Sequence, residues 1–186
     1  KSDREKIEQL HQQNRRTTLR VIGIKQILPA FDTYTGQYSD EIDSLLNLRF
    51  NKTMLDSIFE EGDLVLCPEI RFQLAHWNVD SNFYDNIKFI ANFLRTHPNT
   101  TFEIGVHTDT RVSKYRSTIL SAKRAEAIKK LLVNDFGISE RQITARGYEG
   151  DDPIVPDFRI FPFKNEDLNE YELRHQVNRR TELKVI

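Results

Sequence analysis

The sequence predicts an α/β fold, an α+β sandwich in which one mixed sheet of about four strands carries two main helices on one face. Strand-like and helix-like segments alternate from Asp63 to the end of the chain, a pattern typical of layered α/β domains. Apolar residues recur at helical spacing in two of these segments and alternate with polar residues in the last one. We therefore expect the order β-α-β-α-β-β, preceded by an N-terminal extension.

Two segments have the apolar spacing of amphipathic helices. In residues 81–95 the apolar side chains fall on one face, and Pro98 follows the end of the segment. Residues 121–136 give the clearest helix, because Ser121 is placed to cap its N-terminus and Gly137 to cap its C-terminus. We expect these two helices to cover one face of the sheet.

Four segments have the composition or the alternation of strands. They are residues 64–72, 102–106, 143–146 and 181–186. The first of them is interrupted by Pro68. Residues 153–171 are rich in Phe, Pro, Asp and Glu, and we expect them to form a long loop or a partial helix.

The chain is expected to divide into an N-terminal extension, residues 1–62, and a folded domain, residues 63–186. In the extension, residues 3–16 predict a short exposed helix, residues 18–24 have strand composition, and residues 40–59 carry apolar residues at helical spacing. Because the strand and helix pattern is complete within residues 63–186, we expect that part to fold alone.

The composition excludes several classes of protein. Lys and Arg number 27 against 28 Asp and Glu, a net charge of −1, so the chain has no global basic surface for nucleic acid. No apolar run reaches the roughly 20 residues that a membrane-spanning helix needs. The single cysteine, Cys67, excludes an internal disulfide, and its apolar neighbours predict that it is buried.

The predicted fold brings together two residues of opposite charge. Asp109 follows a strand, and α/β folds commonly place ligand sites at the carboxyl ends of strands. With Ser121 as N-cap, Arg124 falls in the first turn of the next helix, where free backbone N–H groups also favour an anion. This pair complements a zwitterion, with an ammonium group at Asp109 and a carboxylate at Arg124.

Four short motifs follow one another in the second part of the chain. They are Glu-Ile-Gly-Val-His-Thr-Asp at 103–109, Leu-Ser-Ala-Lys-Arg-Ala at 120–125, the set Gly137-Ile138, Arg141 and Gly147-Tyr148, and Asn178-Arg179-Arg180. With these spacings they resemble the OmpA-like domain family, which includes peptidoglycan-associated lipoproteins and flagellar stator proteins. The resemblance covers about residues 64–186 and implies non-covalent binding of the free amino-acid end of diaminopimelate in the peptidoglycan stem peptide.

The resemblance also implies roles for individual residues. Asp109 and Arg124 correspond to the core pair of the diaminopimelate site, and Arg179 supplies a further contact to a carboxylate. Arg111 and Ser117 are additional candidates for ligand contact.

The sequence departs from the family pattern at three positions. Val106 stands where the family usually has glycine, with Gly105 one residue earlier. Val112 replaces another usual glycine, and Ser117 replaces a usual asparagine. We therefore expect the loop after Asp109 to differ, and one side-chain hydrogen bond to the ligand to be shortened or lost.

Two alternatives from other functional classes stay open. An enzyme that cuts or transfers peptidoglycan needs an activated nucleophile or a metal. The serines near the motifs lie outside any Gly-x-Ser-x-Gly turn, and the five histidines are scattered singly. We therefore predict no catalytic residue, no metal and no cofactor. The second alternative is a degenerate domain that serves only protein–protein assembly in the envelope.

The predicted partner is peptidoglycan, with other envelope proteins as possible partners of residues 1–62 and with no nucleic acid. The chain begins at Lys1 without Met, so we expect a signal peptide or a lipid-bearing cysteine upstream, and membrane attachment only through such a segment. The resemblance places the domain on the periplasmic side of the outer membrane in a Gram-negative envelope, as a cell-wall anchor.

Overall fold

The computed structural model describes residues 40–73, 76–111, 113–157 and 168–186. The chain separates into two compact units, and the second of them runs from Gln37 to Ile186. All described residues belong to this second unit. The predicted helix at residues 3–16 and the predicted strand at residues 18–24 lie outside the described residues.

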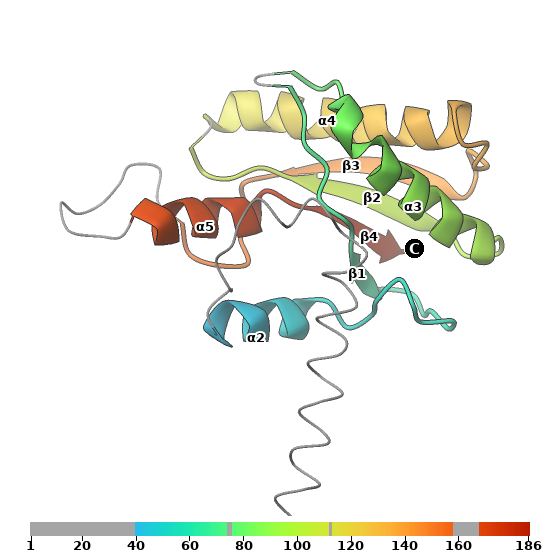
Figure 1. Ribbon diagram of the computed structural model, residues 1–186, viewed down its shortest axis with the longest axis horizontal. Helices are drawn as coiled ribbons and strands as arrows, with labels where there is room; N and C mark the ends of the chain where they lie inside the picture. Colours follow the sequence, from blue (N-terminus) through green and yellow to red (C-terminus); the bar gives the residue numbers. More distant parts are fainter. Residues whose placement is uncertain (1–39, 74–75, 112, 158–167) are drawn as a thin grey trace, which may run out of the picture. The chain divides into compact units, whose positions relative to one another are not determined.

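One four-stranded mixed sheet forms the centre of the unit (Figure 1). Its strands are β1 (Leu64–Leu66), β2 (Phe102–His107), β3 (Ile143–Glu149) and β4 (Thr181–Val185). They lie in the order β1-β4-β2-β3, with β4 antiparallel to both β1 and β2, and β2 parallel to β3. The mixed α/β fold predicted from the sequence is confirmed.

Two helices, α3 (Tyr84–Thr96) and α4 (Lys114–Asn134), lie on the same side of the sheet, as Figure 1 shows. A short 3-10 turn, η2 (Ser81–Phe83), leads into α3. α4 packs mainly on β3 and β2 and also contacts α3. The two predicted helices on one face are therefore confirmed. None of the described helices is long and apolar enough to cross a membrane.

The core lies between the sheet and these two helices. Phe102, Ile104 and Val106 alternate along β2 and are buried on the helix side. Gly147 on β3 is paired with Val106, and a Cβ atom at Gly147 would lie 2.3 Å from the backbone nitrogen of Ala122 in α4. Because only glycine leaves room there, the glycine of the third motif sets how closely α4 approaches the sheet.

The other face of the sheet carries polar side chains that are nevertheless buried. Glu182 on β4 pairs with Gly105 on β2, and both belong to this second face. The ring of Tyr148 lies against Gly105, where a Cβ would come within 2.9 Å of it, and it stacks on His107 with ring centroids 4.7 Å apart. Helix α2 (Asp40–Arg49) covers this face through Arg49, so the segment before β1 is part of the packed unit.

Four element boundaries differ from the sequence prediction. The first strand stops at Leu66, because Pro68 has no N–H to continue the ladder. α2 ends at Arg49 and does not continue to residue 59. In the segment after it, Asp56 accepts hydrogen bonds from the backbone N–H and the hydroxyl of Thr53, and these bonds form a turn in place of a helix.

The other two boundary differences concern α4 and the last connection. α4 begins at Lys114 rather than near Ser121, because buried Ser117 and Ser121 continue the stripe that faces the sheet. Between β3 and β4 the chain forms α5 (Leu168–Asn178), which begins near the end of the predicted loop or partial helix at residues 153–171 and continues beyond it. Gly137 does end α4, with a positive φ of 68°.

Candidate functional site

Asp109 lies in the loop that follows β2 and is only 3% exposed. Its Oδ1 accepts a hydrogen bond from the backbone N–H of Arg111 at 3.1 Å, the i to i+2 pattern by which an aspartate fixes a tight turn. The loop is tied to β3, since the backbone N–H of Thr108 donates to the carbonyl of Glu149 at 2.7 Å. The acid is thus held in one position by local backbone contacts.

Two guanidinium groups bind the second oxygen of Asp109. Arg111 donates from Nε at 3.0 Å and from Nη2 at 2.8 Å, and Arg179 donates from Nη1 at 2.5 Å. Burial by itself raises the pKa of Asp109, but the hydrogen bonds from Arg111 and Arg179 outweigh it and hold the pKa below its usual value. Asp109 is therefore a charged acceptor at neutral pH.

Helix α5 brings the remaining partners to this acid. Glu172 accepts a hydrogen bond from Nη1 of Arg111 at 2.7 Å, and Nδ1 of fully buried His175 lies 3.7 Å from the Asp109 carboxylate. Asn178 fixes the end of the helix: its side chain bonds the backbone N–H and the carbonyl of Val155 at 3.1 and 2.7 Å. Asn178 of the last motif thus has a bracing role that places Arg179 beside the acid.

Arg124 lies in the middle of α4, and the prediction that it occupies a first helical turn is wrong. Ser121 is an interior residue whose Oγ accepts the N–H of Glu149 at 3.3 Å, so it caps no helix. Arg124 donates from Nε to the carbonyl of His76 at 3.1 Å, and its guanidinium lies 4.6 Å from the centre of the Phe72 ring. The segment before α3 therefore holds the Arg124 guanidinium through one hydrogen bond and one cation–π contact.

The Arg124 guanidinium has no carboxylate at ion-pairing distance within the part of the chain that the structure describes. Burial, followed by the positive charge of Arg179, lowers the pKa of Arg124, whereas Asp109 raises it. The three predicted residues therefore interact electrostatically, but only Asp109 and Arg179 are in contact. An anion beside Arg124 would offset both the burial of its guanidinium and the repulsion from Arg179.

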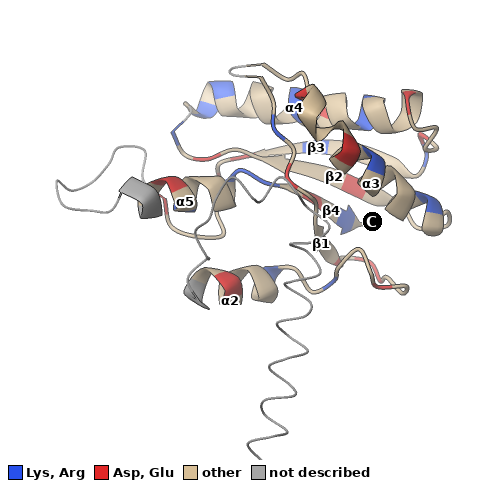
Figure 2. Cartoon of the chain, viewed as in Figure 1, with Lys and Arg blue, Asp and Glu red and all other residues tan. Residues whose placement is uncertain are grey.

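Positive charge exceeds negative charge around Asp109. Along α4, basic residues outnumber acidic ones (Figure 2): Lys and Arg occupy six positions, and Glu126 is the single acid. Around Asp109, Arg111, Arg124 and Arg179 accompany one buried acid and the half-exposed Glu172. This excess of positive charge favours a ligand that brings at least one carboxylate.

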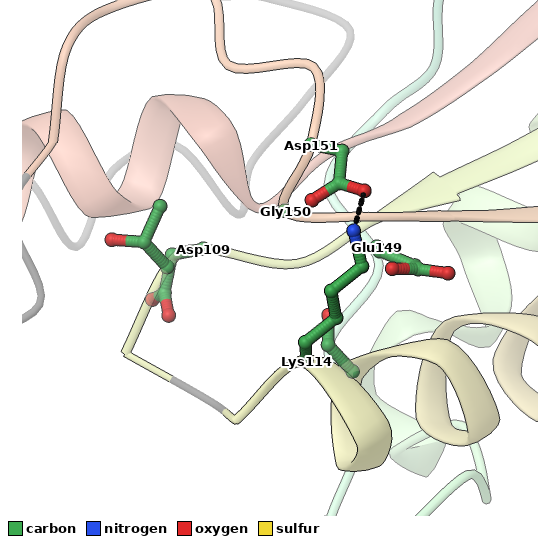
Figure 3. A pocket seen from close by; sticks show the side chains of 7 residues that line it. Asp109, Lys114, Glu149, Gly150 and Asp151 are labelled. Atoms are coloured by element: carbon green, nitrogen blue, oxygen red, sulfur yellow. Dashed lines mark hydrogen bonds and ion pairs between the residues drawn. The ribbon is translucent and has the colours of Figure 1, made fainter.

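A pocket of about 270 Å³ adjoins Asp109 on the side of the first turn of α4 (Figure 3). Lys114 crosses it to Asp151, with Nζ and Oδ2 2.9 Å apart, and Glu149 and Ser117 also line it. Ser117 is 3% exposed, and its hydroxyl is hydrogen-bonded to that of Thr108. Val112, the departure from the family pattern in this loop, lies outside the described residues.

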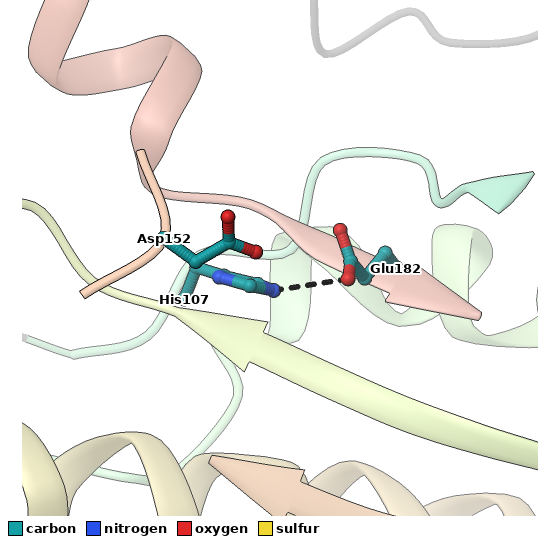
Figure 4. A group of neighbouring side chains, drawn as sticks. All are labelled: His107, Asp152 and Glu182. Atoms are coloured by element: carbon teal, nitrogen blue, oxygen red, sulfur yellow. Dashed lines mark ion pairs between the residues drawn. The ribbon is translucent and has the colours of Figure 1, made fainter. Parts of the chain in front are cut away.

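A second cluster of buried charge lies on the other face of the sheet. His107, Asp152 and Glu182 bring ligand-type atoms within 4.8 Å of one another (Figure 4). Arg49 and Arg180 already neutralise the two acids: Arg49 Nη2 is 2.5 Å from Asp152 and 3.1 Å from Glu182, and Arg180 Nε is 3.0 Å from Glu182. A metal cation would have to displace both arginines, so the cluster fits a brace rather than a metal site.

The protonation states of this cluster agree with a brace. Burial opposes ionisation of Glu182, but the nearby His107 ring, the hydrogen bonds from Arg49 and the charge of Arg180 outweigh it and leave its pKa well below the usual value. Burial also lowers the pKa of His107, whose Nε2 is 3.1 Å from Glu182. The network is charged and internally balanced at neutral pH.

Sequence reasoning placed Asp109 and Arg179 together correctly, and it missed the residues that surround them. Glu172 and His175 lie just beyond the loop or partial helix predicted at residues 153–171, and nothing in their local sequence marks them. Arg180 carried a signal: it lies two residues before Glu182 at the start of a strand, and such residues share a face.

By fold, the chain is a mixed-sheet α/β domain. It superposes on the crystal structure of the periplasmic domain of Helicobacter pylori MotB with a TM-score of 0.51 and 19% sequence identity, covering 69% of this chain and 78% of that chain. This likeness concerns the fold alone.

The sequence comparisons define the family, and the chain belongs to the OmpA family. The family model matches residues 71–158. The chain is 33% identical over 124 residues to a peptidoglycan-associated lipoprotein of Buchnera aphidicola subsp. Baizongia pistaciae, covering 67% of this chain and 69% of that protein. It is 31% identical over 117 residues to outer membrane porin F of Pseudomonas fluorescens, covering 63% of this chain and 32% of the porin. The chain thus spans about a third of that porin's length, and the resemblance seen in the motifs is confirmed.

Proposed function

We propose that this chain binds peptidoglycan non-covalently, through the free amino-acid end of diaminopimelate in the stem peptide, and so anchors an envelope module to the cell wall. Family membership supports the general role, since one relative is named a peptidoglycan-associated lipoprotein. The observation that carries the proposal is the Arg124 guanidinium, which has no carboxylate partner among the described residues and lies in the field of Arg179 and Asp109.

The site offers one group for each charge of a zwitterion. A ligand carboxylate is bound by Arg124, with Arg179 at the edge of the site, where its side chain is 38% exposed. The ligand ammonium is directed to Asp109, which is ionised and almost fully buried. Charge-assisted hydrogen bonds of this kind contribute about 1.5–3 kcal/mol each when sheltered from water.

In this proposal the domain acts on the periplasmic side of the outer membrane and catalyses no reaction. Its charged side chains hold ligand charges and activate neither water nor a nucleophile. Release of soluble muropeptides from purified peptidoglycan, above a buffer control and lost in a point mutant, would overturn the non-catalytic assignment.

One observation favours a second candidate function, an OmpA-like domain that has lost ligand binding and serves protein assembly in the envelope. The hydroxyl of Ser117, which replaces the family's usual asparagine, is hydrogen-bonded to Thr108 inside the protein. The carboxylate of Asp109 is likewise engaged by Arg111 and Arg179. In this case Ser117 and Asp109 keep these internal partners, and the site binds no peptidoglycan ligand.

Calorimetric titration with a diaminopimelate-containing stem peptide separates the two candidates. We expect wild type to bind, and Asp109→Asn and Arg124→Ala each to weaken binding by about 2–5 kcal/mol, because each leaves a ligand charge unpaired. The double variant is expected to lose less than the sum, since both residues act on one ligand. Arg116→Ala, which removes an exposed arginine of the same helix, is the matched control and should bind like wild type.

Two results would contradict the proposal. Binding that survives both substitutions within about twofold, roughly 0.4 kcal/mol, would remove Asp109 and Arg124 from the site. Absence of wild-type binding at millimolar peptide would favour the assembly domain.

A further inference from the structure

The Oδ2 oxygen of the Asp109 carboxylate has no acceptor position left for a ligand ammonium. It accepts three N–H groups, two from Arg111 and one from Arg179. A carboxylate offers about four lone-pair positions in all, two on each oxygen. Oδ1 accepts the backbone N–H of Arg111 and keeps one position, but the side chain is only 3% exposed. An incoming ammonium must therefore displace a guanidinium to bind Oδ2.

Arg111 is the guanidinium that covers the acid. Its side chain is 32% exposed, while that of Asp109 is 3% exposed. It makes the bidentate part of the contact, and it lies 6.0 Å from the centre of the Tyr171 ring on α5. Arg179 instead makes one hydrogen bond to Asp109, and its charge also acts on Arg124, where a ligand carboxylate would be bound.

A second acceptor for Arg111 is already in place. Nη1 of Arg111 donates to Glu172 at 2.7 Å, and the Glu172 side chain is 46% exposed. If an ammonium takes its place on Asp109, Arg111 keeps this partner and turns toward solvent on the α5 side. The exchange substitutes one cation for another on Asp109, so the buried acid is never left uncompensated.

We propose that Arg111 is a specificity-determining residue that occupies the ammonium position of the site in the unliganded protein, and that it competes with the ligand's ammonium rather than binding the ligand. This inference rests on the proposed function. It reverses the role that sequence similarity suggested for Arg111, a direct contact. The consequence is selectivity: a ligand must bring both a carboxylate for Arg124 and an ammonium strong enough to replace a bidentate arginine.

The test compares two peptides on four proteins. The peptides are a stem peptide with a free diaminopimelate end and the same peptide with that amino group acetylated. The proteins are wild type, Arg111→Ala and Arg111→Lys, with Arg116→Ala as the control for loss of an arginine near the site. Circular dichroism confirms that each variant is folded, and Arg111→Lys retains the positive charge if the alanine variant does not fold.

We expect Arg111→Ala to bind the free peptide about tenfold more tightly than wild type, and Arg111→Lys to fall between them, because lysine cannot make the bidentate contact. Affinity for the acetylated peptide should be the same in all the proteins, since it has no ammonium to compete. Weaker binding of the free peptide by Arg111→Ala would show that Arg111 contacts the ligand and would overturn the inference while leaving the proposed function standing. An equal gain for both peptides would also overturn it. Failure of every protein to bind either peptide would contradict the proposed function and the inference together.

Discussion

The described part of the molecule holds two buried acids that are each bound by two arginines, and the two clusters differ in whether every guanidinium has a carboxylate partner. Asp109 is bound by Arg111 and Arg179 in the loop after β2, while Glu182 is bound by Arg49 and Arg180 on the far face of the sheet. The adjacent residues Arg179 and Arg180 thus serve different clusters. Around Glu182, both guanidiniums also reach Asp152, and the side chain of Arg180 is 3% exposed.

Around Asp109 the balance is incomplete. The side chains of Arg111 and Arg179 are 32% and 38% exposed, and Arg124 has no carboxylate partner among the described residues. A closed, balanced cluster stabilises the fold, whereas an open cluster with an unpaired guanidinium can accept a ligand. The difference between a brace and a site therefore lies in the balance of partners, since both clusters are built from the same residue types.

The largest expected effect comes from removing the segment that closes the Glu182 cluster. The shortened chain 63–186, the domain predicted from the sequence, should still unfold cooperatively, but with a free energy of unfolding about 5 kcal/mol below that of chain 37–186. It loses Arg49 from Glu182 and also Phe59, whose ring packs edge-on against Phe93 and Phe102. Urea denaturation of the two chains measures the difference.

Peptide affinity provides the control for this truncation, because the open cluster lies entirely within residues 63–186. A shortened chain that keeps its affinity while losing stability separates the two clusters as we describe. Equal stability of the two chains would show that α2 contributes nothing to the packed unit, contrary to the Arg49 contacts.

A smaller loss is expected from Glu182→Gln. This change leaves half-buried Arg49 and buried Arg180 with Asp152 as their one shared carboxylate, and breaking a buried pair from one side costs about 3 kcal/mol. The matched control is Glu140→Gln, whose side chain is 77% exposed in its pair with Lys129 and which should change stability by less than about 0.5 kcal/mol. Chemical denaturation measures both, and similar losses in the two variants would contradict the view of Glu182 as a buried brace.

Much of this could be predicted from the sequence, and the rest depends on long-range contacts. Helical spacing and strand alternation gave the two helices on one face and the four strands, because these patterns are local. The start of α4 was placed too late because Tyr115 and Ile119 are exposed apolar residues that obscure the periodicity in its first turns. Glu182 occupies a polar position of an alternating strand, and only the tertiary fold, by bringing Arg49 from 133 residues away, makes it a buried charge.

The candidate site residues came from the same kind of local signal. The motif order singled out Asp109, Arg124 and Arg179 as candidates, because each lies in a short recognisable motif. The bidentate contact of Arg111 with Asp109 could not be predicted, because it depends on the side-chain geometry of the loop and on Glu172 from α5. Those contacts decide whether Arg111 binds the ligand or competes with it.

The most direct test of the distinction between brace and site measures unfolding free energy with and without the diaminopimelate peptide for wild type, Arg49→Ala and Arg124→Ala. At a peptide concentration of 100 times the wild-type Kd, wild type should gain about 2.7 kcal/mol. Arg49→Ala should start from a lower stability and gain the same amount. Arg124→Ala should start close to wild type and gain less than about 1 kcal/mol, because its weaker binding reduces the gain. An undiminished gain in Arg124→Ala, or a gain lost in Arg49→Ala, would contradict the assignment of the two clusters.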